Sequence, residues 1–240
     1  MPLCYTGNMT NDGLAADAFY DTPAGAVAAQ IVRARLRLLW PAVTGQRVLG
    51  LGHTAPYLDA WRDDAYCCIA ACPGEMGAAP RRAAALLVEE DALPFADLSL
   101  DRVLLVHGLE NAENARRMLR EVWRVLRDDG RLMVVAPNRV GMWAHIESTP
   151  FGQGQPYSPG QITRLLASSL FRVEQRDTAL YVPPTRLGMV LRSAPFIERV
   201  GRRVLPHLAG VTITEAVKDM YAGIPLRRAK RRRMVLVEGT

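Results

Sequence analysis

The sequence has little of what secreted and membrane-embedded proteins need. Four cysteines in 240 residues are too few for a disulfide framework in a chain of this length. No apolar run reaches the roughly 18–20 residues that cross a bilayer. The first residues also lack the basic and apolar regions of a secretory signal. We therefore expect a cytoplasmic protein in a reducing compartment.

The net positive charge of the chain comes from one segment. The formal net charge is +6, and residues 227–233 alone hold six basic residues and no acid, so the other residues balance at zero. A nucleic-acid groove that runs across the whole fold is therefore disfavoured. This tail could make weak contact with nucleic acid or anionic lipid, or it could be an ordinary solvated tail.

Short apolar runs alternate along the chain with segments of helical spacing. The runs that predict strands are residues 48–51, 65–71, 86–88, 102–107, 132–136, 171–182 and 211–217. The helical segments are 14–39 (with a start at Pro23), 57–63, 158–170, the stretch between the last two strands, and a helix capped by Asn111 or Asn114 and closed at Gly130. This alternation predicts an α/β, Rossmann-like fold, with seven mostly parallel strands and helices on both faces of the sheet.

The chain shows no internal repeat and no clear domain boundary. We expect a single domain over residues 1–222, followed by a basic C-terminal tail over residues 223–240. Two segments are less regular than the rest, at about 140–170 and 184–210. We expect them to form a cap-like insertion over the site.

A glycine-rich stretch follows the first predicted strand. Gly50, Gly52 and Ala55 give the pattern G-x-G-x-x-A. Glycines permit unusual dihedral angles and let a ligand approach the backbone, although the same pattern also occurs in plain tight turns. A dinucleotide site would need an acid about 20 residues further on, at the end of the second strand. That strand ends at Cys72, and the next acid is Glu75.

A second motif follows the third predicted strand. Residues 90–110 read "EDALPFADLSLDRVLLVHGLE", and together with the glycine-rich stretch they resemble class I S-adenosylmethionine-dependent methyltransferases of the type-11 group. Residues 119–138 and 149–171 are similar to later parts of that family, so the resemblance spans about residues 25–182. It implies transfer of a methyl group from S-adenosylmethionine to a small-molecule acceptor.

The resemblance also implies roles for single residues. The two glycines would lie against the methionine and ribose parts of the cofactor, and Asp91 would accept a hydrogen bond from the adenine amino group. A carboxylate suits that amine because it only accepts hydrogen bonds. The cofactor-binding residues implied in this way are Gly50, Gly52, His53, Cys72, Glu75, Asp91, Ala92, Leu93 and His107.

This sequence departs from the family pattern at two positions. The family has an acid at the end of strand two that binds the ribose hydroxyls, and here the aligned residue is Cys72, or Glu75 if the loop is remodelled. The acid before the first glycine is also missing. Losing a charged hydrogen bond to ribose costs roughly 1.5–3 kcal/mol. A degenerate, non-catalytic binding or regulatory protein is therefore the alternative hypothesis.

Catalytic residues are not evident from the pattern. A sulfonium methyl donor is already activated, so a general base is needed only if the acceptor must lose a proton. His107, Glu110 and Tyr157 are the candidates, and each also has a purely structural interpretation. The cysteines Cys67, Cys68 and Cys72 lack the paired spacing of zinc sites, so we expect no metal centre.

Overall fold

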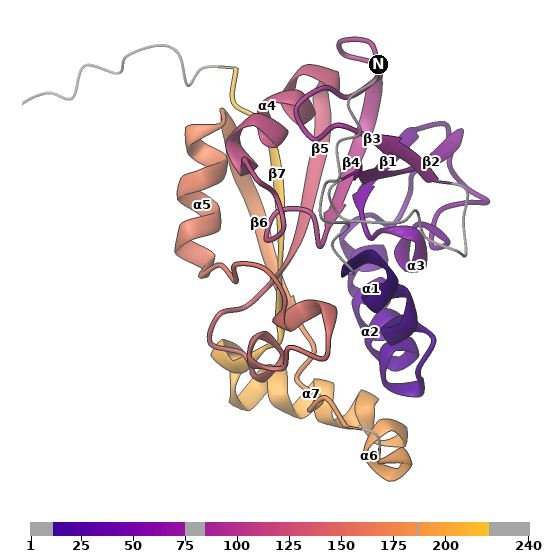
Figure 1. The fold of residues 1–240 in the computed structure, drawn as a ribbon, viewed down its shortest axis with the longest axis vertical. Coiled ribbons are helices and arrows are strands. Elements are labelled where there is room, and N and C mark those ends of the chain that lie inside the picture. Colours follow the sequence, from indigo (N-terminus) through magenta and orange to yellow (C-terminus); the bar gives the residue numbers. More distant parts are fainter. Residues whose placement is uncertain (1–11, 75–84, 186, 221–240) are drawn as a thin grey trace, which may run out of the picture.

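A computed structural model describes residues 12–74, 85–185 and 187–220, and these residues contain one seven-stranded sheet (Figure 1). The strand order is β3-β2-β1-β4-β5-β7-β6. All neighbouring pairs from β3 to β5 are parallel, whereas β7 is antiparallel to both β5 and β6. The strands are β1 (Arg47–Gly52), β2 (Cys67–Pro73), β3 (Ala85–Val88), β4 (Leu100–Val106), β5 (Leu126–Pro137), β6 (Phe171–Ala179) and β7 (Val211–Lys218). The predicted Rossmann-like sheet is confirmed.

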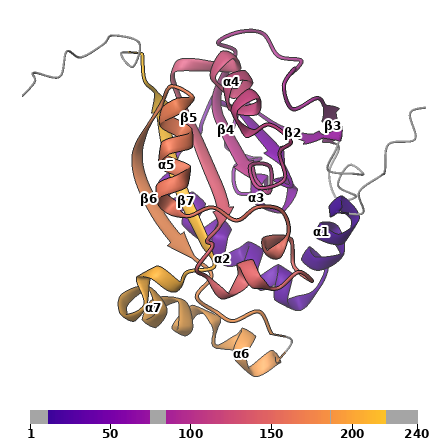
Figure 2. The ribbon, with the colours of Figure 1, turned by 60° about the vertical axis from the view of Figure 1, so that its left-hand side comes forward.

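Helices cover both faces of the sheet (Figure 2). The α-helices are α1 (Asp12–Tyr20), α2 (Pro23–Leu39), α3 (Ala55–Leu58), α4 (Ala115–Val125), α5 (Pro159–Ser168), α6 (Gly188–Arg192) and α7 (Ala194–Val204). Short 3-10 helices are η2 (Met142–His145), η3 (Pro150–Gly152) and η4 (Pro206–Leu208). The helices α1, α2 and α3 pack on one face, and α4 and α5 pack on the other. Residue Glu75 and the basic tail lie outside the described residues.

The alternation of side chains along the strands divides the core in two. In β1, Val48 packs with α1 and α2, while the next residue, Leu49, packs with α4. In β4, Leu104 faces the first core and Leu105 the second. Successive residues of a strand point to opposite faces, so an apolar run such as this one is buried on both sides.

Local capping explains where several helices begin. Pro23 occupies the first turn of α2, and the Thr22 side chain accepts a hydrogen bond from the Gly25 N–H. Asn114, and not Asn111, caps α4 by accepting from the Arg117 N–H. These residues satisfy N–H groups that a helix start leaves unpaired.

Two predicted helix ends are wrong. Gly130 does not adopt a left-handed conformation, because α4 ends at Val125 and β5 begins at the next residue. The helix predicted over 57–63 stops at Leu58 and continues as turns. There the Trp61 indole N–H donates to the Trp40 carbonyl at 2.9 Å, so tertiary contacts outweigh the helical pattern.

A buried carboxylate joins distant parts of the sheet. Glu215 of β7 is 1% exposed. Its Oε1 accepts from the Trp40 indole N–H at 2.8 Å and from Arg131 Nη1 at 3.1 Å, and its Oε2 accepts from Gln175 Nε2. A buried charge needs such partners, so Glu215 links α2 to β5, β6 and β7.

The loop after β1 passes close to the end of β4. Gly52 has a φ of 92°, in the left-handed region. A Cβ built on it would lie 2.3 Å from the carbonyl oxygen of Val106. Glycine is therefore required here both for its backbone conformation and for the missing side chain.

We predict that Gly52→Ala lowers the free energy of unfolding by about 3 kcal/mol, because left-handed strain and a backbone clash add together. Gly45→Ala is the matched control. Gly45 also has a positive φ of 73°, but nothing lies within 4 Å of the built Cβ, so only the strain of about 1 kcal/mol applies. Urea denaturation measures both, and equal losses would contradict the close approach.

Candidate active site

The first strand ends in a buried turn at the carboxyl edge of the sheet. The His53 N–H donates to the Val106 carbonyl at 2.9 Å, which fixes this turn against β4. Gly50 lies two residues before Gly52, inside β1. A Cβ built on Gly50 would lie 2.2 Å from the Thr54 hydroxyl oxygen. Of the two predicted cofactor glycines, Gly52 is in the turn and Gly50 is covered by the Thr54 side chain.

A chain of hydrogen bonds connects α1 and α3 to the end of β4. The Tyr57 and Tyr20 hydroxyl oxygens are 2.6 Å apart, and the Tyr20 hydroxyl lies 2.9 Å from His107 Nε2. His107 Nδ1 lies 3.0 Å from Glu110 Oε1. All four side chains are buried, and the Phe151 ring packs 4.7 Å from the imidazole ring.

The geometry of His107 assigns it a defined role in this chain. A carboxylate only accepts hydrogen bonds, so Nδ1–H donates to Glu110, while Nε2 shares a hydrogen bond with the Tyr20 hydroxyl. Both ring nitrogens are therefore engaged. The residue is 2% exposed and has a φ of 54°, a conformation uncommon outside glycine. His107 thus holds α1 against β4 and has no nitrogen open to an acceptor.

Burial favours the neutral forms of Tyr20 and His53. It raises the pKa of the Tyr20 hydroxyl far above its ordinary value. It also lowers the pKa of His53 to about 3, with a further contribution from the nearby His107 imidazole. Removing a charge from water is costly, so the uncharged forms are favoured. The Tyr20 ring stacks on the His53 ring at 5.1 Å between centroids.

A carboxylate from α1 lies near the ends of β1 and β2. Asp17 Oδ1 is 3.5 Å from His53 Nε2, and that nitrogen is buried with no hydrogen-bond partner among the described residues. Cys72, at the end of β2, is also buried. Its pKa is raised to about 11, mainly by burial and in part by the charge of Asp17. The helix α1 therefore places Asp17 near the end of β2, where Cys72 stands in the position of the family's acid.

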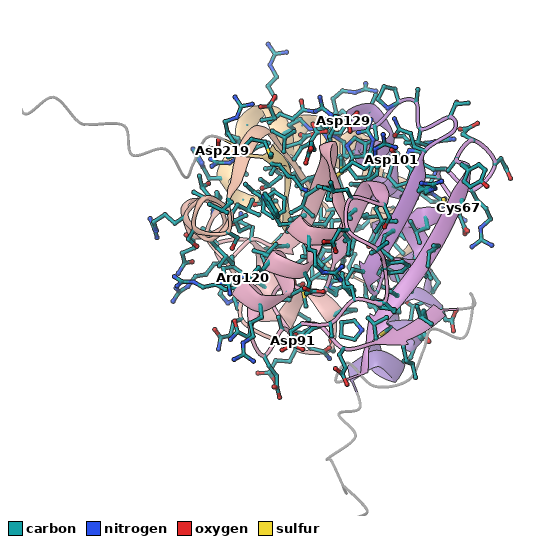
Figure 3. The ribbon with its side chains drawn as sticks, turned by 90° about the horizontal axis from the view of Figure 1, so that it is seen from above. Cys67, Asp91, Asp101, Arg120, Asp129 and Asp219 are labelled. Atoms are coloured by element: carbon teal, nitrogen blue, oxygen red, sulfur yellow. The ribbon has the colours of Figure 1, made fainter. Side chains whose placement is uncertain are left out.

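The motif after β3 lies at the margin of the molecule (Figure 3). The side chain of Asp91 is 43% exposed and pairs with Arg117 at 3.4 Å. Ala92 is exposed, whereas Leu93 is buried in the core with α4, and its N–H donates to Glu121 at 3.1 Å. The structure thus leaves Asp91 and Ala92 accessible and places Leu93 beneath them.

A cavity of about 720 Å³ opens beside α1. It lies between the α1–α2 junction, at Phe19 and Thr22, and the segments that carry Ile146, Thr149 and Pro184. None of the described residues that line it carries a charge. The Phe19 ring also packs against Tyr20 and Phe151. Phe19 therefore lies between the cavity and the hydrogen-bonded side chains around His107.

The structure also shows the surroundings of the catalytic candidate Tyr157, of Asn138 and of the two other cysteines of β2. Tyr157 is partly buried, and its hydroxyl lies 3.5 Å from the Leu109 carbonyl. Asn138 donates to the His207 and Ala209 carbonyls, so it shapes a turn. Cys67 and Cys68, at the start of β2, are partly exposed and unlike the buried Cys72.

Sequence reasoning missed the contribution of α1 to this site. Asp17 and Tyr20 meet residues 36 and 87 positions further along the chain. Their helix was predicted, but nothing in its spacing indicates which polar residues face the sheet. The tyrosine of α3, Tyr57, was likewise part of a predicted helix without an assigned role.

Comparisons with known proteins agree with this fold. A family model described as "Methyltransferase domain", of the type-11 group, matches residues 49–134. Uncharacterised proteins of Mycobacterium tuberculosis and Mycobacterium bovis are each 27% identical over 193 residues. That alignment covers 72% of this chain and 63% of theirs, so the chain spans less than two thirds of the length of these relatives.

Solved structures with the same fold include enzymes of different activity. A Thermotoga maritima protein described as a possible histamine N-methyltransferase has a TM-score of 0.58 and 17% identity, covering 81% of this chain and 91% of its own. A methyltransferase from Archaeoglobus fulgidus has a TM-score of 0.56 and 18% identity, covering 85% and 98%. The [4+2]-cyclase SpnF has a TM-score of 0.54 and 18% identity, covering 78% and 79%. At these identities the likeness shows the fold.

We predict that His53 makes stability depend on pH. Its folded pKa of about 3 lies below the ordinary 6.5, so between these values the unfolded chain takes up a proton that the folded protein does not. The free energy of unfolding therefore falls on acidification, by about 2 kcal/mol from pH 7 to pH 5. In urea denaturation, the free energy of unfolding of His53→Gln should fall by about 2 kcal/mol less than that of the parent protein over the same pH interval. The variant His145→Gln, at an exposed position, should behave like the parent protein, and identical pH dependence in all three would contradict a neutral His53.

Proposed function

We propose that this chain, which has the class I methyltransferase fold and a type-11 methyltransferase domain, binds S-adenosylmethionine and methylates a small organic acceptor. The domain match covers residues 49–134, and these residues run from β1 to β5. The carboxyl ends of β1, β2 and β4 meet within that segment. Open parallel sheets bind their ligands at such ends.

One observation supports a polar ligand at this edge. His53 Nε2 is buried beside Asp17 without a hydrogen-bond partner among the described residues. Unpaired buried polar atoms are costly, and they are rare in folded proteins unless a ligand or water completes them. The residues at the ends of β1 and β2 therefore suit the hydroxyls and amino-acid group of the cofactor.

Asp17 is the residue that we assign to the ribose. The family's acid at the end of β2 is Cys72 here, a buried thiol that remains protonated. Asp17 reaches the same region from α1, and its carboxylate can accept both ribose hydroxyls. At the adenine end, Asp91 and Ala92 are accessible, which is consistent with the adenine role implied by the motif. Gly52 brings the backbone of the β1 loop to the cofactor.

Alignment of the reactants supplies most of the proposed catalysis. S-adenosylmethionine, when bound, supplies a methyl group already activated by its sulfonium sulfur. The protein must hold the acceptor in line with that group and keep water out. The hydrogen-bonded series of Tyr57, Tyr20, His107 and Glu110 serves this purpose, because it fixes α1 over the site. His107 acts as a positioning residue within this series.

The cavity beside Phe19 is the proposed acceptor site. Its walls come from α1, from residues 146–149 and from residues 184–185, and two of these segments belong to the predicted cap. The described residues of this lining are uncharged, and they favour an uncharged acceptor, because a charged one would lose its hydration without gaining a partner among them. In contrast, α5 packs into the core and takes no part in this wall.

Titration calorimetry with S-adenosylmethionine, its demethylated product and NAD tests the proposal. We expect micromolar binding of the first two and none of NAD. Asp91→Ala should weaken binding of both at least tenfold, as expected for a lost charged hydrogen bond. Absence of binding by all three ligands would instead favour a non-catalytic scaffold, and unchanged affinity of Asp91→Ala would remove the adenine assignment.

Asp17→Asn should weaken the same binding by about tenfold while leaving the fold intact. The amide keeps the size of the side chain and removes the charge that accepts the ribose hydroxyls. Asp63→Asn, an exposed acid near the surface turn after α3, is the matched control and should bind like the parent protein. If the two variants bind equally well, α1 does not supply the missing acid.

A further inference from the structure

The helices α6 and α7 expose an unusual number of large apolar side chains. Met189 is 83% exposed, Phe196 67% and Val204 65%. Isolated exposed hydrophobic residues are normal on proteins, but several of them on two consecutive helices, with Phe196, Val200 and Leu205 lining one hollow, point to an interaction site. We call this set the apolar face; its residues are Leu187, Met189, Phe196, Val200, Val204 and Leu205.

The spacing on α7 places apolar and basic residues side by side. Phe196, Val200 and Val204 recur every four residues and form one stripe along the helix. Arg199 and Arg203 are exposed beside that stripe. The helix therefore presents a mixed apolar and positively charged surface to the exterior.

The single acid of α7 does not offset this charge. Glu198 is 6% exposed and turns inward, where its Oε1 accepts from the backbone N–H groups of Tyr181 and Val182. Within the described part of the chain, Arg192, Arg199 and Arg203 have no ion-pair partner. The exposed charge of α6 and α7 is thus all positive.

The apolar face lies at one extremity of the molecule. In Figures 1 and 2, α6 and α7 form its lower end. Residues 184–185, which line the cavity of about 720 Å³, immediately precede α6. A second, smaller hollow of about 290 Å³ lies between Met142 and α7, again with an apolar lining. The smaller hollow therefore adds apolar surface beside the stripe of α7, since Phe196 and Val200 line it.

We propose that α6 and α7 dock on the surface of an anionic lipid bilayer. The interfacial region of a bilayer accepts partly buried apolar side chains and pairs arginine with lipid phosphate. A second copy of the chain fits less well, since two-fold pairing of α7 would bring Arg199 and Arg203 against their own counterparts. No helix among the described residues is long and apolar enough to cross a membrane.

Sedimentation of the full chain with vesicles tests the proposal. We expect binding to phosphatidylglycerol–phosphatidylcholine vesicles, weaker binding as salt rises, and little binding to pure phosphatidylcholine. Arg199→Glu with Arg203→Glu should weaken binding to the anionic vesicles at least about tenfold. Phe196→Ser should weaken it by about tenfold.

Matched controls separate this surface from general charge or hydrophobicity. Arg116→Glu with Arg120→Glu makes the same charge change on exposed arginines four residues apart on α4 (Figure 3). Leu38→Ser removes another exposed apolar side chain, which is 66% exposed on α2. Both should bind vesicles like the parent protein, and circular dichroism should show all variants folded.

Three results would overturn the proposal. The first is no binding of the parent protein to anionic vesicles. The second is equal loss in the α7 and α4 variants, which would assign binding to overall charge or to the tail. The third is a change from dimer to monomer in the α7 variants by light scattering, which would identify a second copy as the occupant. None of these results depends on S-adenosylmethionine binding, so failure here is distinct from failure of the proposed function.

Discussion

The site depends on the close contact between the turn after β1 and the end of β4. The contact requires a residue without a Cβ at Gly52, and the His53 N–H bond to Val106 then holds the turn in place. It aims the imidazole of His53 toward α1, where Asp17 and Tyr20 meet it. A bulkier residue at that one position would separate the two strand ends, and the polar side chains around them would lose their geometry.

Around that contact, the protein buries an unusual density of polar groups. Tyr20, Tyr57, His107 and Glu110 form one continuous hydrogen-bonded chain, and each would be costly to bury alone. Three successive hydrogen bonds between buried side chains favour a single arrangement of the helices that carry them, although Glu110 Oε2 has no partner among the described residues. It explains why α1, which contacts the sheet through few apolar residues, lies at a defined place over the strand ends.

The sheet could be predicted from the sequence because its signals are local. Apolar runs such as residues 102–107 and 132–136 mark central parallel strands without knowledge of their partners. The predicted helix start at Pro23 and the predicted cap at Asn114 are local signals of the same kind. The prediction that Gly130 ends the helix was wrong because the chain enters β5 directly after α4. The pairing of β5 with β4 sets the backbone conformation there, and local propensity does not.

The site was less predictable because its contacts are distant in sequence. The positions of Gly52, His53 and His107 at the strand ends followed from the strands themselves. The partner residues Asp17 and Tyr20 did not, since a helical pattern shows which side is apolar and not which polar residue faces inward. The sequence shows that Cys72 stands where the family has an acid. Only the structure shows that Asp17 of α1 lies near this position.

The place of β7 in the sheet has a consequence for how the protein is made. This strand is the last of the seven in sequence, yet it lies between β5 and β6. On the ribosome, the first 200 residues emerge while the gap between those two strands is still open. During that interval Trp40, Arg131 and Gln175 lack the carboxylate of Glu215 as a partner, and the edges of β5 and β6 that β7 later joins stay unpaired. Unpaired strand edges are prone to association with other chains, so this exposure lasts until residues 211–218 have been synthesised.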